Sequence, residues 1–247
     1  MRRILFEWRG IKLSSYLVML YLGILLGVLA GTYGAWLHGL NPGRVYLALL
    51  LLFPLALVGA RLLFVISHWP MYRREPHRIW RQSDGGASLY GGLILSFLLS
   101  LPLLKILRFP IGAFWDAASI TLLTGMIFTK VGCLLNGCCA GRPTSGPLAL
   151  YLPDLRGIWC RRVPTQLLEA GLAAMILLGL VGLWNRLPFE GALFLYTVAT
   201  YSLGRWWIES TRDDIETMGT LSLHRTISGV LLAVCVMSFW LMWPHQP

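Results

Sequence analysis

The residues best suited to chemistry in this chain are basic and amide side chains set into long apolar runs. Lys130 lies inside one such run, although a basic residue at the centre of a membrane-spanning helix costs about 2.5–3.5 kcal/mol. Arg205, Glu209 and Arg212 recur at i, i+4 and i+7, which places them on one face of a helix. A planar guanidinium binds phosphate through two parallel hydrogen bonds. These residues predict a cationic cradle for a phosphate group, and a structural ion pair at the membrane interface is the alternative for Arg205 and Glu209.

Asn136 follows Lys130 by six residues and begins the turn that contains Gly137 and Arg142. Six residues of continuous helix wind through about 600°, so the two side chains would lie about 240° apart. They share a face only if the helix breaks at Gly132, and such a break would expose backbone amides that bind anions. A lysine that snorkels to the interface is the alternative for Lys130.

Two further segments place polar groups at helix starts. The segment W-R-Q-S-D-G-G-A-S-L-Y-G-G contains Asp84 and Ser88, which we expect to cap a helix that carries Tyr90 one turn into the membrane. The alternative for this segment is a purely structural role, as a capped helix whose glycines allow close packing. The segment P-T-Q-L-L-E-A predicts another helix start, with Gln166 and Glu169 on its early turns.

The composition requires these residues to be held by a membrane domain. Of 247 residues, 56% are hydrophobic and 13% are charged, whereas soluble domains have about 25% charged residues. We predict an all-α polytopic membrane protein, a bundle of about seven transmembrane helices that forms a single domain over residues 1–247. The expected spans are 13–36, 45–67, 88–107, 113–135, 165–184, 191–209 and 226–243, each near the roughly 20 residues that a bilayer requires.

The net charge of +10 comes mainly from arginines in short loops, which favours anionic lipid headgroups over nucleic acid as the partner. The side that holds the start of the chain is richer in arginine, and the positive-inside rule would place that side in the cytoplasm.

The five cysteines match no zinc-binding spacing, and we expect neither a metal nor a cofactor. A disulfide from Cys160 to Cys138 or Cys139 stays open, and Cys235 is expected to be a small core residue.

The motifs taken together resemble those of the prolipoprotein diacylglyceryl transferase family, over nearly the whole chain. The family signature G-R-I-G-N-F-I-N-G-E-x-x-G-R, often with G-C-C-x-G-R-P-T as its second half, is similar to T-K-V-G-C-L-L-N-G-C-C-A-G-R-P-T here. The family's D-G-G-x-S-x-H-G-G corresponds to D-G-G-A-S-L-Y-G-G, H-P-x-Q-L-Y-E to V-P-T-Q-L-L-E, and G-x-x-R-x-x-x-E-x-x-R to S-L-G-R-W-W-I-E-S-T-R. Tyr16 stands at the tyrosine of the family's early W-Y-G.

The resemblance implies transfer of diacylglyceryl from phosphatidylglycerol to the lipobox cysteine thiol in the signal peptide of a prolipoprotein. It implies no cofactor and a monomer in the bacterial inner membrane. It also implies that the start of the chain and the site lie outside the cytoplasm, whereas the distribution of arginines predicts the opposite orientation. The implied catalytic residues are Tyr90, Lys130 and Arg205. The implied phosphatidylglycerol-binding residues are Tyr16, Arg61, Asn136, Gly137, Arg142, Glu209 and Arg212.

This chain departs from the family pattern at four positions. Tyr90 and Val163 replace histidines, Lys130 replaces an arginine, and Cys133 replaces an asparagine. A phenol is a poor base at neutral pH. Two alternatives therefore stay open: a diverged paralogue that uses the same lipid with another acceptor, and a phospholipid-binding or transport protein without catalysis.

Overall fold

The computed structural model describes residues 4–8, 11–79, 88–154, 157–184, 186–213, 217–218 and 221–243. A long helix occupies each range in which a span was predicted. These helices are α1 (Ser15–Leu37), α2 (Pro42–Ser67), α4 (Leu89–Ile106), α5 (Ile111–Asn136), α6 (Thr165–Gly182), α7 (Ala192–Glu209) and α8 (Leu223–Met242). The short helices α3 (Trp69–Tyr72) and η1 (Pro76–Arg78) follow α2. The predicted all-α polytopic fold is confirmed.

Within the described residues, six of the long helices are long and apolar enough to cross a membrane, and α7 is the one that falls short. Its polar residues, which include Arg205 and Glu209, lower its hydropathy. Because α7 packs against α5, α6 and α8, its polar face meets protein and not lipid. The least apolar of the predicted spans is therefore the one that carries two of the predicted site residues.

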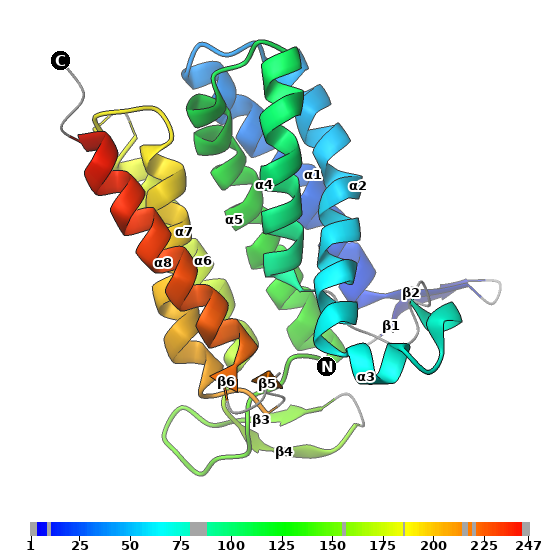
Figure 1. The fold of residues 1–247 in the computed structure, drawn as a ribbon. Coiled ribbons are helices and arrows are strands. Elements are labelled where there is room, and N and C mark those ends of the chain that lie inside the picture. The colour runs from blue at the N-terminus through cyan, green and yellow to red at the C-terminus, as the bar shows by residue number, and fades with distance from the viewer. Residues whose placement is uncertain are drawn as a thin grey trace.

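Three short antiparallel hairpins, which the sequence analysis did not predict, lie at one end of the bundle (Figure 1). They pair β1 (Ile4–Trp8) with β2 (Ile11–Ser14), β3 (Leu150–Pro153) with β4 (Trp159–Arg162), and β5 (Thr217–Met218) with β6 (Leu221–Ser222). Strands this short show too little alternation to be recognised from sequence.

Buried Arg162 fixes the β3–β4 hairpin to the end of α7. Its guanidinium donates to Asp154 at 3.1 Å and to Asp213 at 2.9 Å. Asp154 belongs to the turn of the hairpin, and Asp213 follows the end of α7. The hairpin is therefore held against the chain segment that leaves α7.

Small residues allow the helices of the first half to approach closely. A glycine recurs along the α1 face that packs on α5, and a Cβ added at Gly27 would lie 2.7 Å from the carbonyl oxygen of Thr121. Gly59 of α2 and Gly91 of α4 face each other, and a Cβ on either would collide with the carbonyl of the other. Such small-residue faces are how membrane helices gain packing contacts that lipid cannot offer.

The helices form two groups joined by α5 (Figure 1). One group holds α1, α2, α4 and α5, and the other holds α6, α7 and α8. At the end away from the hairpins, the buried carboxylate of Asp116 on α5 accepts hydrogen bonds from the backbone amides of Gly191 and Phe194, at 2.7 and 2.8 Å. Asp116 thereby caps the start of α7 and aligns it with α5.

Candidate active site

Alternating helix directions bring polar residues of several helices to one end of the bundle. Lys130 and Arg205 lie in the last two turns of α5 and α7, whereas Tyr90 and Glu169 lie in the first two turns of α4 and α6. The ends of α5 and α7 adjoin the starts of α4, α6 and α8, at the end where the hairpins lie (Figure 1). The site is therefore near one membrane surface.

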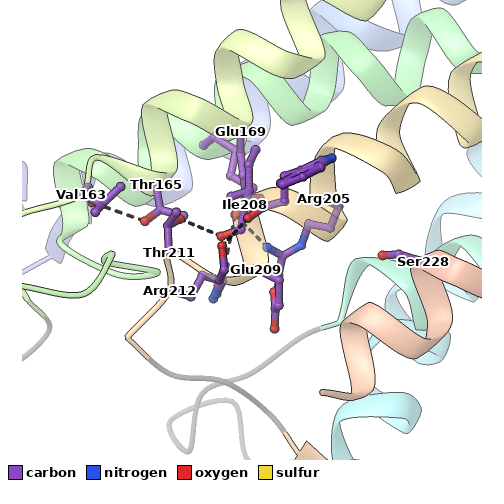
Figure 2. Close-up of polar contacts among 12 residues, drawn as sticks. Val163, Thr165, Glu169, Arg205, Ile208, Glu209, Thr211, Arg212 and Ser228 are labelled. Atoms are coloured by element: carbon purple, nitrogen blue, oxygen red, sulfur yellow. Dashed lines mark hydrogen bonds and ion pairs between the residues drawn. The ribbon is translucent and has the colours of Figure 1, made fainter. Parts of the chain in front are cut away.

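The carboxylate of Glu169 is the centre of the site. It forms an ion pair with Lys130, and it lies 3.1 Å from Arg212 and 3.6 Å from Arg205. The carboxylate is 1% exposed, and Figure 2 shows it directed from α6 toward Arg205 and Arg212. Glu169 was absent from the predicted site residues. The signal that could have found it is an acid in the second turn of an otherwise apolar helix.

Glu209 is the second carboxylate of this cluster. Its oxygen lies 2.7 Å from a guanidinium nitrogen of Arg205, which confirms that the i, i+4 spacing forms an ion pair (Figure 2). The hydroxyl of Ser222 also donates to Glu209, at 3.3 Å. With Lys130 and Arg212 included, three cations share two carboxylates. The cluster therefore holds one surplus positive charge, which favours an anionic ligand.

Arg212 lies beyond the end of α7 and is held by backbone contacts. Gly141 bridges to Arg212, and the amide of Arg142 donates to the carbonyl of Thr211 at 2.9 Å. Burial lowers the pKa of Arg212, but the charges of Cys139 and Glu169 outweigh that effect and hold the pKa above its ordinary value. Arg212 therefore stays charged where it meets Glu169.

Lys130 and Asn136 lie on a continuous helix, so the break considered at Gly132 is wrong. Gly132 is instead a packing position, where an added Cβ would lie 2.9 Å from the Met19 side chain on α1. The helix ends at Gly137, whose φ of 80° is left-handed. Lys130 and Asn136 accordingly face different directions, and only Lys130 reaches the carboxylate cluster.

Tyr90 is buried where α4 meets α7 and α8. Its hydroxyl lies 2.5 Å from the Ser228 hydroxyl, and its ring meets Tyr201 edge-on, with 6.5 Å between centroids. The ring of His224 lies 5.7 Å from that of Tyr90, tilted by 40°. The sequence analysis missed His224. The signal for it was a histidine two residues before the last predicted span, and the structure places it in the first turn of α8.

The start of α4 differs from its expectation in one respect. Ser88 precedes α4 with an extended backbone, but its side chain makes no capping hydrogen bond, so the expected cap is wrong. The Ser88 amide donates to the Ala60 carbonyl of α2 at 3.0 Å, and this bond holds the segment instead. Asp84, the other expected cap, lies outside the described residues.

Arg61 lies apart from the carboxylate cluster. Its Nε donates to the carbonyl of Ile79 at 2.7 Å, and its Nη2 donates to the Tyr72 hydroxyl at 3.2 Å. These bonds hold the segment after α2. The side chain of Arg142 is exposed. Lipid contact by either arginine stays a prediction.

The sulfur atoms of Cys133, Cys138 and Cys139 lie within 4.8 Å of one another. The sequence analysis grouped Cys138 and Cys139 with Cys160, but Cys160 lies on β4 and all five cysteines are free thiols. Tyr16 on α1 packs against α5 at Gly132, the residue before Cys133. The thiols and Tyr16 therefore border the site.

Comparison with known proteins agrees with the motifs. The family model for prolipoprotein diacylglyceryl transferase matches residues 3–241. Three relatives are named phosphatidylglycerol–prolipoprotein diacylglyceryl transferase. The protein of Trichormus variabilis is 30% identical over 99% of this chain and 91% of its own length. The Clostridium perfringens protein, whose name ends in 2, is 28% identical over 94% of each chain. The Clostridium botulinum protein is 26% identical over 95% of this chain and 96% of its own. The chain therefore belongs to the prolipoprotein diacylglyceryl transferase family.

Proposed function

We propose that this protein transfers the diacylglyceryl group of phosphatidylglycerol to the lipobox cysteine of a prolipoprotein. The cysteine sulfur attacks the glyceryl carbon, a carbon–sulfur bond forms, and the bond from that carbon to the phosphate oxygen breaks. Glycerol phosphate leaves with the bonding electron pair, and the thiol proton passes to a base. The observation that carries the proposal is the buried cluster in which Lys130, Arg205 and Arg212 converge on Glu169.

The cations serve the leaving group in this proposal. Lys130 and Arg205 stabilise the negative charge that develops on the departing phosphate. Such electrostatic stabilisation of the transition state is usually the largest single contribution to catalysis. Glu169 and Glu209 hold the cations in place before the lipid arrives. Arg212 completes the cradle, while Tyr16, Asn136 and Gly137 line its edge, where we propose that the headgroup binds.

Tyr90 and His224 handle the proton in this proposal. The centroids of the two rings lie 5.7 Å apart. An imidazole is the better base at neutral pH. His224 therefore accepts the thiol proton, and Tyr90, anchored through Ser228, orients the histidine. His224 would replace the base that the Tyr90 substitution removed.

The protein is a multi-pass membrane protein, and we infer the bacterial inner membrane as its location. The apolar helices and the basic loops support contact with anionic phospholipid. We also propose a monomeric single domain over residues 1–247 that has no nucleic-acid partner.

The proposal is tested with purified protein, phosphatidylglycerol vesicles and a synthetic lipobox peptide. We expect the thioether-linked diacylglyceryl peptide and glycerol phosphate to form in equal amounts, as measured by mass spectrometry. A peptide with serine in place of the lipobox cysteine is the control and should stay unmodified. Lipid consumption without peptide modification would favour a paralogue with another acceptor. Bound lipid without turnover would favour a binding or transport protein.

A further inference from the structure

The end of α5 brings three cysteines together by a backbone motif. The amide of Cys138 donates to the Cys133 carbonyl at 3.1 Å, and the amide of Gly137 donates to Leu134 at 3.3 Å. This is the Schellman arrangement, in which the residue after the left-handed glycine folds back over the last helical turn. In this motif the residue after the glycine usually makes an apolar contact with the last helical turn. Here the two residues at these positions are Cys138 and Cys133, so two thiols meet.

Cys139 completes the group through a backbone conformation that is uncommon for its residue type. Its φ is 55°, in the left-handed region that side chains other than glycine rarely adopt. The sulfur of Cys139 joins the other two within 4.8 Å. A non-glycine residue held in this conformation is a feature often found at functional sites.

The separations suit one metal ion. Metal–thiolate bonds of about 2.3 Å in trigonal or tetrahedral geometry give sulfur–sulfur distances of roughly 3.8–4.0 Å. The three sulfur atoms lie within 4.8 Å of one another and need to move only slightly to reach these distances. Among the described residues, no histidine, aspartate or glutamate completes the group as a fourth ligand. Zinc structural sites are almost always four-coordinate, whereas soft thiolate sets also select Cu(I).

The surroundings offset the charge of such a centre. Three thiolates and one Cu(I) ion carry two negative charges. Arg212 and Lys130 both lie close enough to Cys139 to interact electrostatically with a thiolate there. A buried anionic centre needs such cationic partners.

We propose that Cys133, Cys138 and Cys139 form a three-thiolate site for a thiophilic metal ion, with Cu(I) as the ion that fits best. The ion binds as the thiols release their protons to solvent. Cys160 and Cys235 take no part, since neither belongs to this group. The site is separate from the carboxylate cluster but adjoins it through Arg212.

The test titrates the full-length, fully reduced protein in detergent with Cu(I) against a competing Cu(I) chelator. We expect one ion per chain, and X-ray absorption should report three sulfur ligands. Cys133→Ser, Cys138→Ser and Cys139→Ser should each weaken binding at least tenfold. The matched controls, Cys160→Ser and Cys235→Ser, should bind as tightly as the wild type. Equal binding by the variant that lacks all three cluster thiols would overturn the proposal.

A second measurement uses the unaltered protein, in case a serine variant does not fold. Maleimide labelling followed by peptide mapping is carried out with and without one equivalent of Cu(I). We expect protection of the three cluster cysteines and unchanged labelling of Cys160. Protection of Cys160 to the same degree would overturn the site. A disulfide between any two cluster cysteines that persists under mild reduction would overturn it as well.

Discussion

Lys130 of α5 and Glu169 of α6 form an ion pair that joins the two groups of helices at the site, where both side chains are largely withdrawn from solvent. The same carboxylate also forms ion pairs with Arg205 and Arg212. One acid thus holds three cations that would otherwise repel one another. The relationship explains how a membrane domain keeps a cation-rich site folded before substrate binds.

Replacing Glu169 should affect both folding and activity. Glu169→Ala leaves three buried cations with too little compensating charge, and breaking a buried ion pair costs about 3–5 kcal/mol. We expect a large fall in thermal stability in detergent, measured by tryptophan fluorescence, together with loss of transfer. Glu75 is an exposed acid that pairs with Arg78, so Glu75→Ala is the matched control and should be nearly silent. Wild-type stability of Glu169→Ala would contradict the central role of the carboxylate.

Lys130 should tolerate a change of shape better than a loss of charge. Lys130→Met removes a cation from the leaving group, and loss of one such stabilising group typically lowers turnover about 10²–10³-fold. Lys130→Arg keeps the charge and should retain most of the turnover. The transfer assay with lipobox peptide measures both variants.

Lys105, exposed near the end of α4, provides the control. Lys105→Met should leave transfer unchanged. If Lys130→Met transferred as fast as the wild type, Lys130 would have no role in catalysis.

His224 should matter more for turnover than Tyr90. General-base catalysis contributes roughly 10²–10⁴-fold, and His224→Ala should lose a factor in this range. Added imidazole should restore part of that turnover, because it can occupy the vacated space as a base. Tyr90→Phe loses only the contact with Ser228 and should keep most of its activity. The opposite ranking of the two variants, without rescue by imidazole, would assign the proton to Tyr90.

Arg162 and its neighbour Arg161 offer a matched pair for stability. Arg162 is buried between Asp154 and Asp213, whereas Arg161 is exposed. Arg162→Met should lower the thermal midpoint and open the β3–β4 hairpin to proteolysis, because two acids lose their partner. Arg161→Met should leave both measurements unchanged. Equal effects of the two variants would show that the ion pairs do not hold the hairpin.

Gly59 tests the close contact of α2 with α4. Gly59→Ala places a Cβ against the Gly91 carbonyl, and overpacking of this kind costs about 1–3 kcal/mol. Gly171 has nothing within reach of an added Cβ. Gly171→Ala should therefore gain roughly 0.5–1 kcal/mol from helix propensity. Thermal unfolding of both variants in the same detergent provides the comparison.

The sequence by itself determined the helices, the membrane class and most of the charged site. Apolar runs of spanning length dictate helices, because a membrane leaves no other way to satisfy the backbone. The i, i+4 spacing of Arg205 and Glu209 was enough to predict their ion pair, since a helix fixes that distance locally. The motifs were enough to identify the family, which the family model confirms.

Only the tertiary structure decided which partners meet across helices. Glu169 lies 39 residues along the chain from Lys130, and no local spacing records their contact. His224 meets Tyr90 because the starts of α4 and α8 lie at the same end, and Cys133 joins Cys138 because the helix ends in a left-handed glycine and not at Gly132. Arg61, which the motifs placed with the lipid, instead holds the segment that follows α2. These outcomes depend on how the helices pack, and packing is a property of the whole chain that no single motif contains.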